Sequence, residues 1–108
     1  MPGLRPNWFH VLVALARGER HGSDIARDVL AQTDGRLRLW PATLYRTLDE
    51  MARERLIEEL TGEAHPEGES ARRRYYRMTR RGRVELSKAA ARMAELAGMA
   101  IRRLEDAP

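Results

Sequence analysis

Residues 41–55, with the sequence PATLYRTLDEMARER, begin with a proline and place Leu44, Leu48 and Met51 at helical spacing. Proline is well tolerated at the first position of a helix, because the missing amide hydrogen has no helical partner there. Apolar residues at i, i+4 and i+7 fall on one face of a helix. The stretch therefore predicts an amphipathic helix, and its neighbours in the chain decide which fold it belongs to.

Two more helices are predicted before this one. Residues 7–17 are apolar on nearly every side, which predicts a helix that is buried on more than one face. Residues 22–33 carry apolar side chains at helical spacing and Asp24 in the first turn, where a carboxylate favours the helix dipole. We expect residues 19–21 to form a short polar connection and residues 36–40 to be extended.

A hairpin and a long helix are predicted to follow. Residues 56–60 and 72–79 have the pattern of two strands, joined by a polar loop at residues 61–70. From Thr79 to about Glu105, apolar or small residues recur in alternating steps of four and three, which is the heptad pattern of helix pairs. The order of elements predicts a mainly α (α+β) fold, a winged helix-turn-helix, with a DNA-binding domain at residues 1–79 and a dimerisation helix at residues 80–108.

Composition excludes several classes of function. The chain has 108 residues and no cysteine, so it forms no disulfide, thiolate nucleophile or zinc-finger site. No apolar run approaches the roughly 18 residues that a membrane span needs, and we expect a cytoplasmic protein with no membrane partner. The histidines are far apart in the chain, and no glycine-rich phosphate loop is present. We therefore expect no enzyme, no metal site and no cofactor.

The net charge of +4 is unevenly distributed. Residues 1–68 carry 9 basic and 11 acidic side chains, residues 69–83 carry 7 and 1, and residues 84–108 carry 4 of each. The surplus of positive charge therefore falls on the second predicted strand, at residues 72–79, and on the start of the last helix. A run of arginines without counter-charges repels itself, which favours a polyanionic partner such as DNA, whereas a solvated charge run is the alternative.

Candidate DNA contacts on the helix at residues 41–55 follow from its outer face. Arginine pairs with guanine edges, and threonine offers a hydrogen bond or a methyl contact. We expect base contacts from Thr43, Arg46 and Thr47. Tyr45 either touches a phosphate or belongs to the core.

Arginines outside that helix are candidates for contacts with the DNA backbone. We expect the predicted hairpin at residues 56–79, which forms the wing, to contact the DNA backbone or the minor groove through Arg73, Arg74 and Arg77. Arg36 and Arg38 either reach phosphates beside the major groove or are ordinary exposed positions.

Three stretches carry a resemblance to a known family. His21-Gly22-Ser23-Asp24-Ile25 resembles a His-Gly-Tyr-Glu-Ile motif, residues 41–48 resemble a segment that begins Pro-Gly-Thr-Leu-Tyr, and residues 74–82 resemble Arg-Tyr-Tyr-x-Leu-Thr-x-x-Gly. Their order and spacing hold over about residues 8–90. The sequence thus resembles the PadR family of bacterial winged-helix transcriptional regulators, in its short class with a single C-terminal helix. Trp40 stands where a serine is frequent, which removes a side-chain N-cap worth about 1 kcal/mol.

The resemblance implies a homodimeric repressor that binds an inverted-repeat operator in double-stranded DNA. Short members of the family release DNA when a small molecule binds, and a small aromatic effector would stack on Trp8 or Trp40. A protein-interaction module that binds no DNA is the alternative. The resemblance also implies that the last helix packs on the partner's first helix. The dimer contacts expected from these two helices are Trp8, Val11, Leu12, Leu15, Leu86, Met93, Ala97, Ala100 and Leu104.

Overall fold

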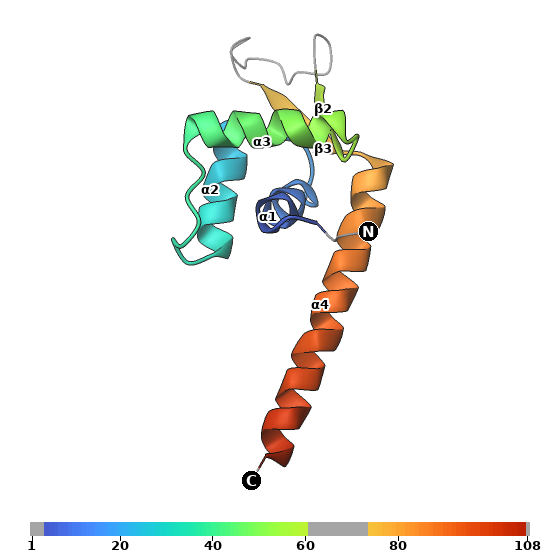
Figure 1. Cartoon of the computed structure of the whole chain (residues 1–108). Helices are drawn as coiled ribbons and strands as arrows, with labels where there is room; N and C mark the ends of the chain where they lie inside the picture. The colour runs from blue at the N-terminus through green and yellow to red at the C-terminus, as the bar shows by residue number, and fades with distance from the viewer. Residues whose placement is uncertain (1–3, 61–73, 108) are drawn as a thin grey trace.

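The computed structural model describes residues 4–60 and 74–107 (Figure 1). The described residues form three helices, a small sheet and a long final helix, which confirms the predicted mainly α winged helix-turn-helix fold. The predicted loop at residues 61–70 and the wing residue Arg73 lie outside the described residues. The elements are α1 (Pro6–Leu15), β1 (Arg20–His21), α2 (Gly22–Gln32), α3 (Pro41–Arg53), β2 (Ile57–Leu60), β3 (Tyr75–Met78) and α4 (Arg80–Asp106).

Helix α1 lies at the centre of the body, with α2 and α4 on either side and α3 running across it (Figure 1). It contacts α2, α3, β3 and α4, so the prediction of burial on more than one side is confirmed. The predicted inner face of α3 is also confirmed, because Leu44, Leu48 and Met51 are all buried. The rest of the core around these side chains includes Val11, Leu12, Leu15, Ile25, Val29, Leu56, Ile57 and Tyr76.

The sheet is antiparallel, with the strand order β1-β3-β2. Strand β1 was not expected, because the sequence predicts only a polar connection at residues 19–21. Its two residues pair with Tyr75 and Tyr76 of β3, and the amide of Gly22 donates to the carbonyl oxygen of Arg74 at 3.1 Å. Two residues are too few to show alternation, so only the fold brings this strand to its partner.

Helix α3 ends at Arg53, two residues earlier than predicted. Arg55 has a left-handed backbone with a φ of 61°, and the amide of Leu56 donates to the carbonyl oxygen of Met51 at 3.0 Å. This is the hydrogen bond of a helix C-terminus whose left-handed position is usually a glycine. In the sequence no glycine marks the end of α3, so the helix predicted from the spacing of apolar residues is two residues too long.

Thr79 caps α4, because its hydroxyl accepts from the amide of Gly82 at 3.0 Å. The same hydroxyl lies 2.6 Å from the carbonyl oxygen of Arg55 and 3.0 Å from that of Leu56, where it can donate. A Cβ on Gly82 would overlap the Leu56 carbonyl oxygen, so the backbones must meet there. The Thr-x-x-Gly part of the motif thus joins the end of the hairpin to the start of α4.

Candidate nucleic-acid interface

Helix α3 presents a row of polar side chains to solvent. Arg46 is exposed over 70% of its side chain, as predicted for a base contact, and Thr43 lies half-buried at the edge of the exposed face. The placement of Thr47 on the outer face is wrong, since Thr47 is only 6% exposed. The reason is that α1 packs along this flank of α3, so the buried face is wider than the stripe of apolar residues indicates. The exposed polar row consists of Arg46, Asp49 and Arg53, and Ala42 precedes it on the same face.

The N-terminus of α3 has no side-chain cap. Trp40 occupies the N-cap position without a side-chain hydrogen bond, as the sequence predicts. Its indole is 64% exposed, and the guanidinium of Arg38 lies 5.1 Å from the ring centroid. Both residues line a groove of about 340 Å³ with Ala26, Leu30 and Leu39. Arg36 is exposed just before this groove.

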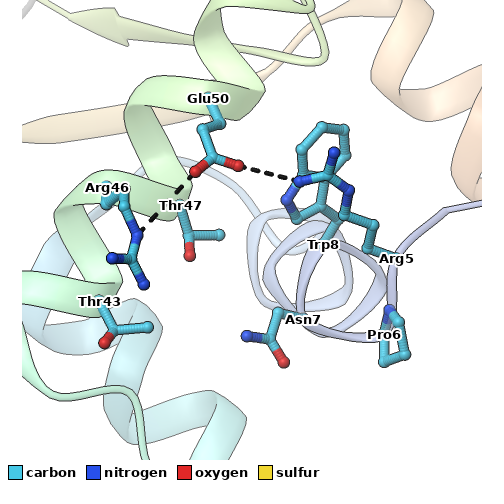
Figure 2. Close-up of a pocket in the computed structure, with 8 residues that line it drawn as sticks. All are labelled: Arg5, Pro6, Asn7, Trp8, Thr43, Arg46, Thr47 and Glu50. Carbon is cyan, nitrogen blue, oxygen red and sulfur yellow. Dashed lines mark hydrogen bonds and ion pairs between the residues drawn. The ribbon is translucent and has the colours of Figure 1, made fainter.

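A chain of ion pairs connects α3 to the start of α1 (Figure 2). Glu50 lies between two arginines, 3.1 Å from Arg5 and 4.0 Å from Arg46. The guanidinium of Arg5 also lies 4.6 Å from the centroid of the Trp8 ring. Trp8 and Trp40 therefore line different cavities, and the fold does not bring the two predicted effector residues together.

Arg74 connects the hairpin to α3. Its guanidinium lies 2.8 Å from Glu59 and 2.9 Å from Asp49, and it stands over the ring of Tyr45 at 5.1 Å. The hydrogen bond to Glu59 is the main cause that raises the pKa of Arg74. Tyr45 is half-buried and packs against the core. The prediction that Arg74 lacks a counter-charge is wrong, because two carboxylates from separate elements hold it.

Arg77 also has a partner across the hairpin. It lies directly opposite Glu58 in the β2–β3 register, and the two side chains form an ion pair at 2.6 Å. Both side chains are about half exposed, so the pair is worth little in water. In the described part of the hairpin the excess of positive charge is thus smaller than the sequence indicates, because Glu58 and Glu59 of β2 pair with arginines that are distant from them in sequence.

The first turns of α4 carry three arginines that belong to the basic segment at residues 69–83 but were not among the candidate DNA contacts. Arg80, Arg81 and Arg83 are exposed, and in the described part of the chain their side chains have no ion pair. Cations at a helix N-terminus oppose the helix dipole and cost a few tenths of a kcal/mol to about 1 kcal/mol each. Two signals in the sequence point to them, the charge surplus over residues 69–83 and this unfavourable position directly after the N-cap Thr79.

The residues predicted for the dimer separate into two groups. Val11, Leu12 and Leu15 are at most 2% exposed within their own chain, so their assignment to a dimer surface is wrong. Trp8 and Leu86 are partly buried against the same core. In contrast, the second half of α4 extends away from the body (Figure 1). Its exposed apolar or small side chains include Met93, Leu96, Ala97, Ala100, Ile101 and Leu104.

Two further features bear on the classes of function. Within residues 4–60 and 74–107, no group of three His, Cys, Asp or Glu side chains is placed to hold a metal ion. None of the described helices combines the length and the hydropathy that a membrane span requires.

Comparisons with known proteins agree with this geometry. The model of the transcriptional regulator PadR-like family matches residues 11–88. A PadR family transcription regulator from hypervirulent Clostridium difficile has a TM-score of 0.72 at 20% identity, covering 91% of this chain and 97% of that one. A transcriptional regulator from Clostridium thermocellum has a TM-score of 0.67 at 25% identity, covering 90% of this chain and 87% of that one. Bacillus subtilis PadR in complex with operator DNA has a TM-score of 0.66 at 22% identity, covering 80% of this chain and 47% of that one. No curated protein sequence matches the chain.

Proposed function

The chain belongs to the transcriptional regulator PadR-like family, and from this premise we propose that it is a homodimeric repressor that binds operator DNA through α3. The observation that carries the proposal is the exposed face of α3, where Arg46 extends into solvent from a helix that is anchored along its other side. A helix presented in this way fits the major groove, where arginine discriminates guanine. The fold-related Bacillus subtilis PadR was solved with operator DNA.

Affinity for the DNA backbone would come from arginines that have no acidic partner among residues 4–60 and 74–107. Arg80, Arg81 and Arg83 are the exposed candidates, together with Arg36 before α3. Arg74 and Arg77 reach a phosphate only by giving up their carboxylates, so we assign them chiefly to the positioning of the hairpin.

The dimer would form through the exposed stripe on α4. Leu104 is 76% exposed and Ile101 is 56% exposed, and burial of such side chains against a second copy is favourable. The alternation of large residues with Ala97 and Ala100 permits close helix packing. Two-fold symmetry then predicts an inverted-repeat operator with half-sites about one helical turn, or a multiple of it, apart.

An effector site would use Trp40. Its exposed indole lines a groove at the first turn of α3, so a planar ligand stacked there would contact the beginning of the DNA-binding helix. Quenching of tryptophan fluorescence in the wild type and not in Trp40→Leu would support this assignment. Equal quenching in both proteins would contradict it.

The proposed function is tested by binding to double-stranded DNA at several salt concentrations. We expect log K to fall linearly with log salt, with a slope of about −0.9 for each phosphate neutralised. An absence of binding even at low salt would contradict the proposal and favour a protein-interaction module.

A further inference from the structure

A pocket of about 420 Å³ lies between the N-terminus of α1 and one flank of α3 (Figure 2). Asn7 faces it from α1, and Thr43 and Thr47 face it from α3. The pocket lies beside Arg46, the candidate base contact, and so borders the surface that DNA would cover.

Thr47 leaves a hydroxyl without a partner in this pocket. The residue is only 6% exposed, and no described residue forms a hydrogen bond with its hydroxyl. The hydroxyl points into the space between Thr43 and Asn7 (Figure 2). The hydroxyl oxygen is accessible from the pocket, because among the described residues only the Tyr76 hydroxyl is both fully buried and without a partner. An acceptor in the pocket can therefore complete the hydrogen bonding of Thr47.

The charges around the pocket leave a surplus of one positive charge. Arg5 and Arg46 share the single carboxylate of Glu50, at 3.1 Å and 4.0 Å. Both guanidinium groups remain about 70% exposed, so each keeps donors for a further acceptor. A group with one negative charge and several acceptor oxygens would balance the site, as a phosphodiester does.

The end of α1 adds to this preference. Arg5 occupies the N-cap without a side-chain hydrogen bond, and the first turn holds no acidic residue. The amides of a helix N-terminus lack intrahelical acceptors and favour an anion. The end of this ten-residue helix lines the same pocket as Thr47 and Arg46, which come from a different part of the chain.

We propose that the pocket binds one backbone phosphate of DNA, which rests on the proposed function. A helix in the major groove has a phosphate backbone on each side. The hairpin lies on the flank of α3 that carries Asp49, as the Arg74–Asp49 pair shows, whereas α1 lies on the flank that carries Thr47. The phosphate in the pocket would therefore belong to the strand opposite the wing, and α3 would be held from both sides.

Three substitutions separate this role from a structural one. Arg5→Gln removes a charge at the phosphate, so the salt slope should flatten by about 0.9 and binding at 0.1 M salt should weaken about eightfold. Thr47→Val removes only the neutral hydroxyl, so binding should weaken while the slope is unchanged. Glu50→Gln removes the repelling carboxylate and should strengthen binding. Arg102→Gln, on exposed α4, is the matched control and should change neither quantity.

The decisive measurement combines these proteins with operator DNA in which single phosphates are replaced by neutral methylphosphonates. We expect one position in each half-site to weaken the wild type strongly and Arg5→Gln much less, whereas Thr47→Val, which keeps both arginines, should still be weakened at that position. Independent effects at every position would overturn the proposal, as would variants that bind like the wild type.

Two controls keep the outcomes apart. If the wild type binds no DNA, the proposed function fails, whereas normal wild-type binding with insensitive variants rejects only the phosphate site. Inorganic phosphate is the second control. If it alters tryptophan fluorescence in a Thr47-dependent way while no methylphosphonate matters, the site takes a free anion, and the DNA assignment is overturned.

Discussion

The phenol ring of Tyr45 in α3 lies against Gly22 at the start of α2, so closely that a Cβ on Gly22 would stand 2.5 Å from the Tyr45 hydroxyl oxygen. Arg74 covers the ring from the hairpin at 5.1 Å. The three stretches that carry the family resemblance therefore meet at one point. Tyr45 thus packs between α2 and the hairpin. The size of its ring explains why the residue that it contacts in α2, twenty-three positions earlier, is a glycine.

We expect Gly22→Ala to destabilise the protein by about 1–3 kcal/mol, because the new methyl group forces the Tyr45 ring out of its place. In a Tyr45→Ala background, Gly22→Ala should lower the free energy of unfolding by much less, because the space of the missing Tyr45 ring can take the new methyl group. Urea unfolding of the four proteins measures this coupling. Additive free energies would show that the two residues do not compete for the same space.

Tyr76 should make stability depend on alkaline pH. The residue is fully buried, its hydroxyl has no hydrogen-bond partner among the described residues, and burial raises the pKa of Tyr76 above the ordinary value near 10. Below pH 10 the phenol is protonated in both the folded and the unfolded chain, so its contribution to the free energy of unfolding does not change with pH. Above pH 10 the unfolded chain loses the proton first, and the free energy of unfolding should fall by up to about 1.4 kcal/mol per pH unit.

Tyr76→Phe isolates this effect. The variant should be at least as stable as the wild type at pH 7, because an unpartnered buried hydroxyl is removed, and it should lose less stability between pH 10 and pH 11.5. Unfolding in urea at both pH values provides the comparison. A clear loss of stability at pH 7 would mean that the hydroxyl has a partner.

The arginines at the start of α4 should have opposite effects on stability and on DNA binding. Replacing Arg80 and Arg81 by Gln removes cations from a helix N-terminus and should leave the melting temperature unchanged or slightly raised. The same change should weaken binding to all DNA sequences alike and flatten the salt slope by about 1.8, for two phosphate contacts. The matched control replaces Arg102 and Arg103, at the other end of α4, and should leave the slope unchanged. Equal slopes in all three proteins would exclude this backbone contact.

Leu104→Glu or Met93→Glu should yield a monomer in sedimentation, because a carboxylate in the exposed stripe of α4 opposes burial against a second copy. Val84 supplies the control, since it is 46% exposed but lies nine residues before Met93, on the opposite side of the helix. Val84→Glu should keep the mass of the wild type. An unchanged dimer mass in the stripe variants would reject the proposed dimer surface.

Periodic features of the sequence predicted most of the fold. The inner face of α3 and the long α4 follow from local spacing, and the structure confirms both. Strand β1 was missed because it is two residues long and is defined by a partner in β3. Val11, Leu12 and Leu15 were assigned to the dimer because an apolar residue looks the same in sequence whether its own chain or a second copy buries it.

The candidate site was less predictable than the fold. The outer position of Arg46 follows from helical spacing, but the burial of Thr47 depends on where α1 crosses α3. Likewise, the acids that pair with Arg74 come from α3 and β2, and their distance in sequence hides the pairing. Charge counted along the chain therefore overstates the charge that the described part of the hairpin presents.

Selection of bound sequences from random DNA, with the wild type and with Arg46→Ala, shows whether Arg46 on α3 determines which DNA sequence is bound. We expect an inverted repeat for the wild type, and for the variant a motif that loses preference at one base pair in each half-site, with a cost of about 1–3 kcal/mol at that position. An identical motif from both proteins would show that Arg46 does not read the DNA sequence, and no motif from the wild type would show that the protein binds without sequence preference.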